Sequence, residues 1–287
     1  HPALRMEDYA GTRKGKTAFV VSAGPSLKHE MDNLKKFSSD PDAIIICVSR
    51  VFKKLKDYGI RVDYHLNCEM FAWDAAIFDG FTKEFVGDSI FLFPPVCAPE
   101  TVAKWPGKKV CTFDINAAEL VGNRMSMMAG NSVSHHIYNW AAQILKCDRV
   151  ILVGQDLSYT EPTGETHVAG STPAGWPQAS KDDDGNKQNE AWEECQTQEG
   201  PFNGETCHRM EVLMEAGAGI VPVGLVHVRT SPAYVCFRDL LDILIKRLGV
   251  KTYNACPNGL KVNRAEYVNL SKLERVADLS AAECSVK

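Results

Sequence analysis

The stretch VILVGQDLSY, residues 150–159, begins with a run of apolar residues and ends abruptly in polar ones. A short run that is apolar at every position is typical of a strand buried in a parallel sheet that helices cover on both faces. In open α/β sheets, ligands bind at the carboxyl ends of the strands. This stretch therefore predicts both the class of the fold and a loop that faces a ligand.

Other short apolar runs alternate with segments of helical periodicity along the chain. The predicted strands are at residues 17–22, 43–48, 63–67, 89–93, 110–113, 150–154 and 219–223. The predicted helices are at residues 51–58, 132–145, 206–216 and 232–248. Such alternation favours crossover connections, so we expect an α/β protein with a mainly parallel sheet and helices on both faces.

The composition is that of an ordinary globular protein. Of the 287 residues, 45% are hydrophobic, the formal net charge is -4, and Lys and Arg are scattered along the chain. This balance disfavours a nucleic-acid partner, and the apolar runs are far shorter than the roughly 20 residues that span a bilayer. The 10 cysteines are spread without a Cys-x-x-Cys pair, which favours reduced thiols and a cytoplasmic location.

The chain divides into three parts by pattern. Residues 1–15 form an N-terminal extension, residues 16–262 form one ligand-binding domain, and residues 263–287 form a C-terminal tail that we expect to be helical and loosely attached beyond Leu270. Within the domain, the pattern fails over residues 161–205, which are rich in Gly, Pro, Asp, Asn and Gln. A long irregular segment inside a compact domain is usually either a functional lid or disordered, and we favour a lid.

The first predicted strand runs directly into a turn of small residues. Gly24 and Pro25 lie between Ser22 and Ser26, and a helix follows. Gly permits close approach of a ligand, while hydroxyl groups and exposed amides at a helix start donate to a phosphate, so the turn is a candidate anion site. The alternative is a plain tight turn. Since it is neither Gly-x-Gly-x-x-Gly nor a Lys-bearing P-loop, dehydrogenases and P-loop NTPases are disfavoured.

A second turn of small polar residues lies before the helix predicted at 132–145. It contains Gly130, Asn131 and Ser132, of which Asn131 or Ser132 can cap the helix. His135 and His136 follow, but adjacent residues of a helix point in different directions, so a paired metal site is disfavoured and no metal ligands are assigned.

Further candidates follow two other strands. Gln155, Asp156 and Tyr159 come after the strand at 150–154, although Asp156 could instead brace its loop. His65 and Glu69 flank the end of the strand predicted at 63–67, whose last residue is Asn67, and we expect this segment to face the same cleft.

His167 lies on the predicted lid, within the segment THVAGS at residues 166–171. Histidine is a candidate general acid or base at neutral pH, although a lone loop histidine is more often without such a role.

Several segments together resemble the family of bacterial motility-associated factor glycosyltransferases and archaeal-type 6-hydroxymethylpterin diphosphokinases. They are VVSAGPSL at 20–27, GIRVDYHLNCE at 59–69, GNSVSHHIYNWAAQIL at 130–145, and VILVGQDLSYT at 150–160 with THVAGS up to 171. The resemblance spans residues 16–262, departs clearly at 172–204, and implies a Rossmann-like domain.

The two branches of that family imply different reactions. The transferase branch resembles bacterial sialyltransferases and implies transfer of a nonulosonic acid from a CMP-sugar to an acceptor protein or glycan. The pterin branch implies transfer of diphosphate from ATP with magnesium, and its pattern places aspartates after the third strand. The segment HLNCE at residues 65–69 has none, so we favour glycosyl transfer. A non-catalytic nucleotide-binding module is a third alternative.

The resemblance also implies roles for the candidate residues. His167 would accept the proton of the acceptor hydroxyl, with Asp156 the next candidate base and Tyr159 beside them in the catalytic set. Residues around the phosphate and nucleotide would be Ser22, Gly24, Pro25, Ser26, Asn67, Glu69, Gly130, Asn131, Ser132 and Gln155. No resident cofactor is implied for the transferase; magnesium belongs only to the diphosphokinase alternative.

Overall fold

The fold of the computed structural model is built on one parallel sheet. The structure describes residues 5–114, 118–119, 125–128, 130–159, 167–171, 207–210, 225–228, 230 and 232–279. Eight strands form the sheet in the order β10-β9-β6-β1-β2-β3-β4-β5, and every pair of neighbours is parallel. The strands are β1 (Thr17–Val21), β2 (Ala43–Val48), β3 (Tyr64–Leu66), β4 (Ile90–Phe93), β5 (Lys108–Cys111), β6 (Arg149–Val153), β9 (Lys251–Asn254) and β10 (Glu266–Tyr267).

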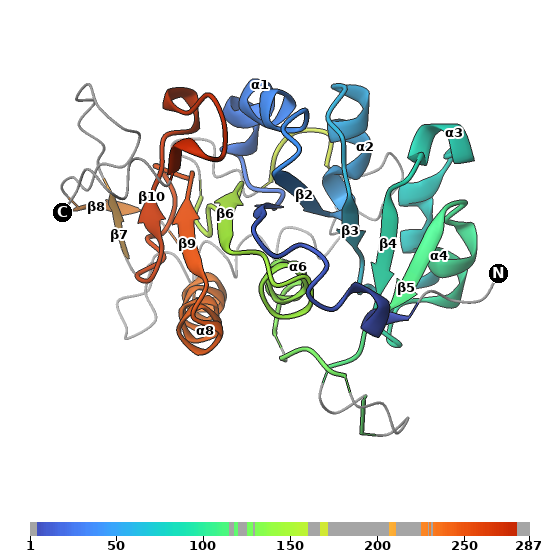
Figure 1. Cartoon of the computed structure of the whole chain (residues 1–287). Coiled ribbons are helices and arrows are strands. Elements are labelled where there is room, and N and C mark those ends of the chain that lie inside the picture. Colours follow the sequence, from blue (N-terminus) through green and yellow to red (C-terminus); the bar gives the residue numbers. More distant parts are fainter. Residues whose placement is uncertain are drawn as a thin grey trace, which may run out of the picture.

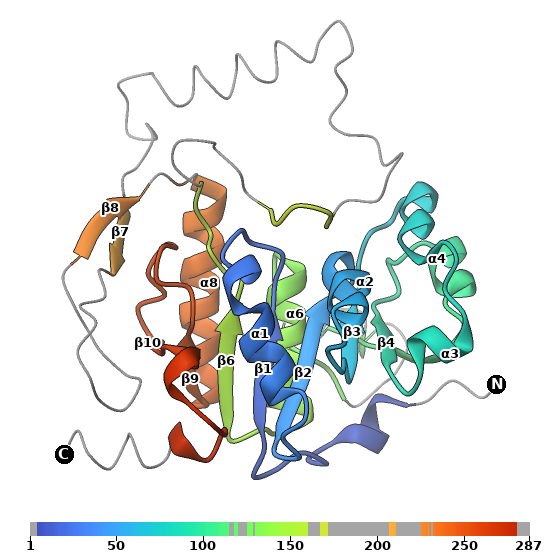
Figure 2. The same ribbon diagram turned by 90° about the horizontal axis from the view of Figure 1, so that it is seen from above.

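Helices cover both faces of this sheet. Figure 1 shows α1 and α2 on one face and α6 and α8 on the other, and Figure 2 shows the same layers from above. The helices are α1 (Leu27–Phe37), α2 (Ser49–Asp57), α3 (Lys83–Val86), α4 (Pro99–Lys104), α6 (Val133–Asn139) and α8 (Pro232–Leu248). Short 3-10 helices are at Met6–Tyr9, Ala72–Phe78 and Leu270–Lys272, and a π-helix, Trp140–Ile144, continues α6. The predicted Rossmann-like α/β fold is confirmed.

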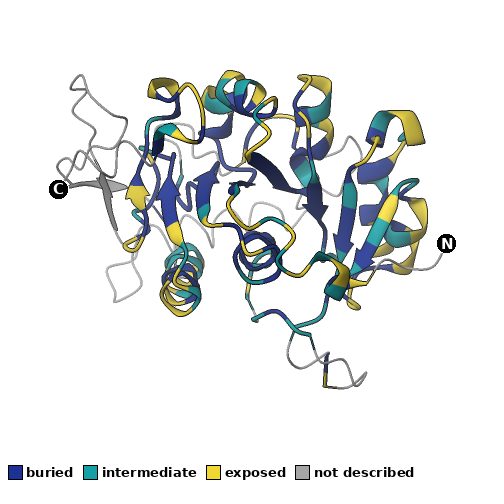
Figure 3. Cartoon of the chain, viewed as in Figure 1, coloured by how far each residue is buried: buried dark blue, intermediate teal, exposed yellow. Residues whose placement is uncertain are grey.

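The central strands are buried on both faces, which explains their uninterrupted apolar runs. All residues of β1 and of β2 are buried, and the sheet is dark blue across the middle of Figure 3. A strand with one face in water would alternate apolar and polar residues, but a covered strand has no polar face. The core therefore lies on both sides of β1, β2 and β6.

Most predicted elements are confirmed, with ends that differ by a few residues. The exceptions are on the C-terminal side of β6. The prediction of a helix at 206–216 is wrong for residues 207–210, the part of that range that the structure describes. Cys207–Met210 is strand β7, which is antiparallel to β8 (Leu225–Val228). The strand predicted at 219–223 lies outside the described residues, as does most of the irregular segment 161–205. No helix in the described part of the chain is long and apolar enough to cross a bilayer.

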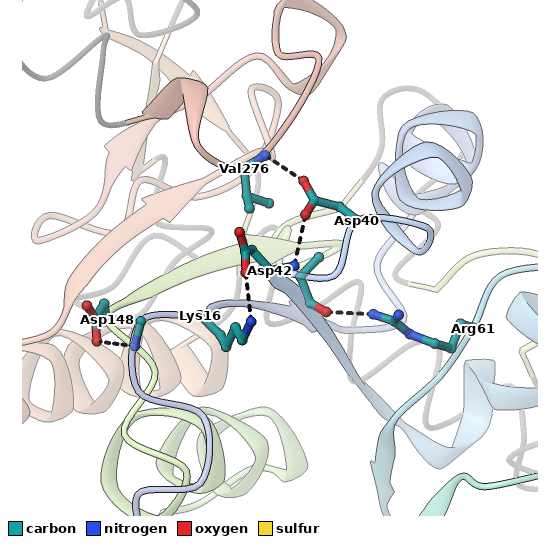
Figure 4. Close-up of polar contacts among 8 residues, drawn as sticks. Lys16, Asp40, Asp42, Arg61, Asp148 and Val276 are labelled. Carbon is teal, nitrogen blue, oxygen red and sulfur yellow. Dashed lines mark hydrogen bonds and ion pairs between the residues drawn. The ribbon is translucent and has the colours of Figure 1, made fainter.

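Polar contacts at the amino end of the sheet join segments that are distant in sequence (Figure 4). Asp40 accepts from the main-chain nitrogen of Val276 at 3.1 Å and from that of Asp42 at 2.9 Å. The side chain of Asp42 pairs with Lys16 at 2.7 Å. The C-terminal segment is thereby held against the chain that enters β1 and β2.

The C-terminal segment is firmly packed as far as it is described. After the 3-10 helix Leu270–Lys272, Leu273, Val276 and Leu279 are at most 3% exposed. The expected loose attachment beyond Leu270 is therefore wrong up to residue 279. Apolar residues at every third position bury one face of this irregular segment against the core.

Candidate functional site

A cavity of about 530 Å³ lies at the carboxyl ends of β1, β2, β3 and β6. β1 has β2 on one side and β6 on the other, so the strand order changes direction here, as at the binding site of other open α/β sheets. Predicted site residues that line it are Ser22, Gly24, Asn67, Glu69, Asn131, Ser132, Gln155, Asp156 and His167. Predicted site residues that do not line it are Pro25, Ser26, Gly130 and Tyr159. The structure thus brings together residues from every predicted segment.

The turn after β1 is bonded to the turn after β6. Asp156 Oδ2 accepts from Ser26 Oγ at 2.9 Å and from the Ser26 main-chain nitrogen at 3.1 Å. Ser26 precedes α1, so this carboxylate occupies the position at the helix start where an anion is favoured. Burial raises the pKa of Asp156, and the two bonds from Ser26 act in the opposite direction.

The contact between Asp156 and Ser26 leaves no room for a side chain at position 24, which is glycine. A Cβ at position 24 would lie 2.0 Å from Asp156 Oδ2 and 2.5 Å from the carbonyl oxygen of Gly154. The space beside Gly24 is therefore filled by the protein itself, although the residue also borders the cavity.

The main chain around Asp156 is constrained as well. Leu157 has a φ of 49°, which is unusual for a residue with a side chain. The carbonyl oxygen of Asp156 accepts from the Leu260 nitrogen at 2.7 Å, and a Cβ on Gly259 would lie 2.6 Å from that oxygen. Beside it, Ser22 Oγ donates to Gln155 Oε1 at 2.6 Å. These contacts give the end of β6 one fixed shape.

The turn before α6 is organised by a capping serine and a buried histidine. Ser132 is the N-cap, and its Oγ accepts from the His135 nitrogen at 3.4 Å. His135 Nδ1 accepts from the Asn131 nitrogen at 3.2 Å, so the Nε2–H donates to the Phe237 carbonyl oxygen at 2.8 Å. Burial lowers the pKa of His135 to about 4. His135 is buried and neutral, while His136 is partly exposed.

The loop after β3 is fixed by Asn67. Its Oδ1 accepts from the Glu69 nitrogen at 3.0 Å, and its Nδ2 donates to the carboxylate of Asp74. Asp74 is 1% exposed, and burial raises its pKa. Glu69 Oε1 lies 3.9 Å from Arg50 Nη2, at the limit of an ion pair.

His167 reaches the cavity from the short described segment 167–171, which lies beyond the carboxyl ends of the strands in Figure 2. The Val168 nitrogen donates to the Ala23 carbonyl oxygen at 2.7 Å, and Lys54 Nζ donates to that of Ala169 at 3.0 Å. Partial burial, and then the positive charge of Arg50, lower the pKa of His167. The ring is therefore neutral at pH 7 and able to accept a proton.

Tyr159 does not line the cavity itself but contacts a residue that does. Its ring lies 5.8 Å from that of Tyr234, which lines the cavity together with Phe237. Both aromatic residues come from α8, the helix that follows β8 in the chain.

The sequence analysis missed several residues of the cavity wall, among them Ser49 and Arg50. They directly follow β2 at its carboxyl end. The rule that singled out Asn67 and Gln155 applies equally to them, so a signal was present.

The carboxylates of the cavity do not fit a magnesium site. Asp156 is bonded to Ser26, Asp74 is bonded to Asn67, and Glu69 lies beside a guanidinium. Throughout the described ranges, no group of three or more His, Cys, Asp or Glu is arranged to hold a metal ion. This donor set lacks the convergent oxygens that magnesium prefers.

A family model described as "6-hydroxymethylpterin diphosphokinase MptE-like" matches residues 3–162, more than half of the chain. The chain belongs to this MptE-like family. The match covers β1 to β6 and ends just after the polar loop that contains Asp156. A comparison with curated protein sequences found no match.

Solved structures similar to this MptE-like chain include two transferases. One is the MAf glycosyltransferase from Magnetospirillum magneticum AMB-1, with 17% identity and a TM-score of 0.64 over 96% of this chain. The chain spans only 38% of the length of that protein. The other is the sialyltransferase CstII from Campylobacter jejuni in complex with a substrate analogue, CMP-3FNeuAc, with 12% identity, a TM-score of 0.46, and coverage of 90% of this chain and 88% of that one. At these identities, the first likeness establishes the fold.

Proposed function

We propose that this protein is a glycosyltransferase that moves a nonulosonic acid from a CMP-sugar to an acceptor hydroxyl. The observation that carries the proposal is the cavity at the centre of the sheet, which combines fixed polar groups with a neutral histidine at its edge. The shared fold with a glycosyltransferase supports it.

In this proposal, the nucleotide lies against the turns that follow β1, β3 and β6 and against the turn before α6. Ser22, Gln155, Asn67 and Asn131 line the cavity and offer hydroxyl and amide groups to the ribose and base. Their partners within the chain fix their positions before a ligand arrives, which lowers the cost of ordering the site.

His167 is proposed as the base for the acceptor hydroxyl. A neutral imidazole near its working pH is an effective proton acceptor, and this ring is held at the cavity by the anchors of Val168 and Ala169. Asp156 is the next candidate, although its carboxylate is buried and bonded to Ser26. The acceptor, a protein or a glycan, would approach from the His167 side.

The test is a thermal-shift screen followed by turnover. CMP and a CMP-nonulosonic acid should raise the melting temperature, since a ligand that binds only the native state stabilises it. Release of CMP from the sugar nucleotide should follow when an acceptor is added. Stabilisation by CMP compounds without any release of CMP would instead indicate a non-catalytic nucleotide-binding module. A lack of response to all CMP compounds contradicts the proposal.

The family description favours one second candidate, a 6-hydroxymethylpterin diphosphokinase. That enzyme would consume ATP in the presence of magnesium and a pterin alcohol. The same screen separates the two, because ATP with magnesium, rather than CMP, would then stabilise the protein and be turned over.

A further inference from the structure

We propose that the phosphate group of the ligand binds to Arg50 and Ser49 at the start of α2, and not to the turn between β1 and α1. The inference rests on the proposed function only in taking the cavity as the nucleotide site. It assigns the phosphate to the side of the cavity that the sequence analysis overlooked.

The charges of the cavity wall point to Arg50. Among the described residues that line the cavity, Arg50 is the only Lys or Arg, whereas Glu69, Asp74 and Asp156 supply carboxyl groups. A phosphate is repelled by carboxylates and attracted to a guanidinium, which presents a planar pair of donors to two of its oxygens. Glu69 Oε1 lies 3.9 Å from Arg50 Nη2, which is longer than a direct hydrogen bond.

The starts of α1 and α2 differ in whether a carboxylate is hydrogen-bonded to the start of the helix. At α1, the Ser26 nitrogen and hydroxyl both donate to Asp156, so a phosphate there would meet a carboxylate. At α2, the N-cap is Val48, no side chain caps the helix, and the first turn contains no acidic residue. The positive end of the α2 dipole therefore adds to the attraction of Arg50.

Ser49 is held in position from behind. Its Oγ lies 2.8 Å from Nδ1 of His65, a residue that is fully buried among aromatic rings. Nε2 of His65 is buried without a hydrogen-bond partner, which favours the tautomer with the hydrogen on Nδ1. Ser49 Oγ then accepts from Nδ1, and its own proton is left to donate at the cavity wall. The pair offers a phosphate one charged group and one neutral donor on adjacent residues.

The proposal predicts a specific loss of affinity for phosphate compounds. Binding of CMP, cytidine, ATP and inorganic pyrophosphate is measured by calorimetry for the wild type, Arg50→Gln, Arg50→Lys, Ser49→Ala and Ser26→Ala. Arg50→Gln should bind CMP and pyrophosphate about 10- to 100-fold more weakly, the range for a lost charge-assisted bond, and cytidine within about twofold. Arg50→Lys should recover part of the loss, Ser49→Ala should weaken CMP by about 3- to 10-fold, and Ser26→Ala should stay within about threefold.

Lys53→Gln is the matched control. Lys53 lies on the same helix, has an exposed side chain that pairs with Asp57, and does not line the cavity. It changes the net charge by the same amount, so a general electrostatic effect would appear in both variants. Circular dichroism confirms that each variant is folded.

Three results overturn the proposal: full CMP and pyrophosphate affinity in Arg50→Gln, a larger loss in Ser26→Ala than in Arg50→Gln, or a wild type that binds neither CMP, ATP nor pyrophosphate. A wild type that binds pyrophosphate and ATP through Arg50, but not CMP or a CMP-sugar, refutes CMP-sugar transfer and leaves the phosphate site standing. Failure of the proposed phosphate site and failure of the proposed CMP-sugar transfer therefore give different results.

Discussion

Asp156 occupies a position that the sequence predicted for contact with a ligand, and the structure shows that it is also a bracing residue. It lines the cavity and accepts two bonds from Ser26, its carboxylate lies against Gly24, and its main chain lies against Gly259. The position could be predicted because polar residues that end a buried strand face the ligand edge of the sheet. The contacts could not, because Ser26 and Gly259 are far from Asp156 in sequence and only the folded chain brings them together.

Gly24→Ala should destabilise the protein by about 1–3 kcal/mol, the usual cost of overpacking. The new Cβ would lie 2.5 Å from the Gly154 carbonyl oxygen, which belongs to the main chain and cannot rotate away. Gly80→Ala is the control, because nothing lies within 4 Å there and only its φ of +74° opposes the change. Urea denaturation of both variants measures the difference, and equal losses would show that the contact at Gly24 relaxes freely. Because a side chain at position 24 also disturbs the contact between the two turns, a binding defect in a Gly24 variant does not by itself show that Gly24 contacts the ligand.

His167→Asn should lower kcat far more than it weakens binding of a CMP-sugar, since a base acts in the transition state. The pKa of His167 is below its ordinary value of 6.5, so wild-type turnover should be lost only as the pH falls below that value. Arg50 contributes to this lowering, and Arg50→Gln should therefore move the acid limb of the pH profile to higher pH. Turnover rates at saturating donor check both points. An unchanged kcat in His167→Asn would leave Asp156 as the next base to test.

His135 should make the fold sensitive to acid. The unfolded chain takes up a proton near pH 6.5, whereas the folded chain does so only at about 4. Between these values the unfolded state binds more protons, so the free energy of unfolding falls as the pH is lowered. Between about pH 7 and about pH 5, this one residue should account for roughly 2 kcal/mol. In His135→Gln, urea titrations at the two pH values should show a smaller loss by that amount, and an identical loss would contradict the prediction.

At the scale of elements, the sequence predicted what depends on local pattern. The central strands are buried on both faces and carry uninterrupted apolar runs, so they are recognisable on their own. β9 and β10 are short and mix charged with buried residues; β9 pairs with the edge of β6, and β10 pairs with the edge of β9. α1 did carry a signal, since its buried residues Leu27, Met31, Leu34 and Phe37 recur at helical spacing.

The residues of the candidate site also fall into two groups: those that their position along the chain predicts, and those that only the folded structure identifies. Residues at strand ends were predictable from position alone, and they line one cavity. Arg50 is the only guanidinium among the described residues of the cavity wall, which also include three carboxyl groups, and this makes it the candidate for binding a phosphate. That comparison requires knowing which side chains share the wall, and no pattern along the chain supplies it.

Ser132 links an element to the site, and its two roles can be separated. Ser132→Ala removes the N-cap of α6 and should cost about 1 kcal/mol of stability. Ser132→Asp restores a capping oxygen but places a negative charge on the cavity wall. If Ser132 lies near the phosphate, the Asp variant should be as stable as the wild type in urea and bind CMP more weakly in calorimetry. Equal CMP affinity in wild type and Ser132→Asp would limit this residue to capping.

At the scale of the whole molecule, the C-terminal segment is part of the core. A chain that ends at Asn263 loses β10 and the buried side chains of Val268, Leu270, Leu273, Val276 and Leu279. Full burial of such a side chain contributes about 1.5–3 kcal/mol, and their sum rivals the roughly 5–15 kcal/mol of a typical domain. The truncated chain should therefore lack cooperative thermal unfolding in circular dichroism. A melting curve like that of the full chain would show that the segment is dispensable.

The strand order also determines when, during synthesis, β1 gains its second neighbouring strand. Thr17 pairs with Ala43 on one side and with Arg149 on the other, so β1 leaves the ribosome long before its second neighbour exists. Until β6 arrives, the most buried strand of the native sheet presents an open apolar edge, the kind of surface on which nascent chains associate wrongly. The cavity needs Gln155 and Asp156 from the far side of that same gap. A growing chain therefore acquires its ligand site and protects its most vulnerable edge in one event, the docking of β6.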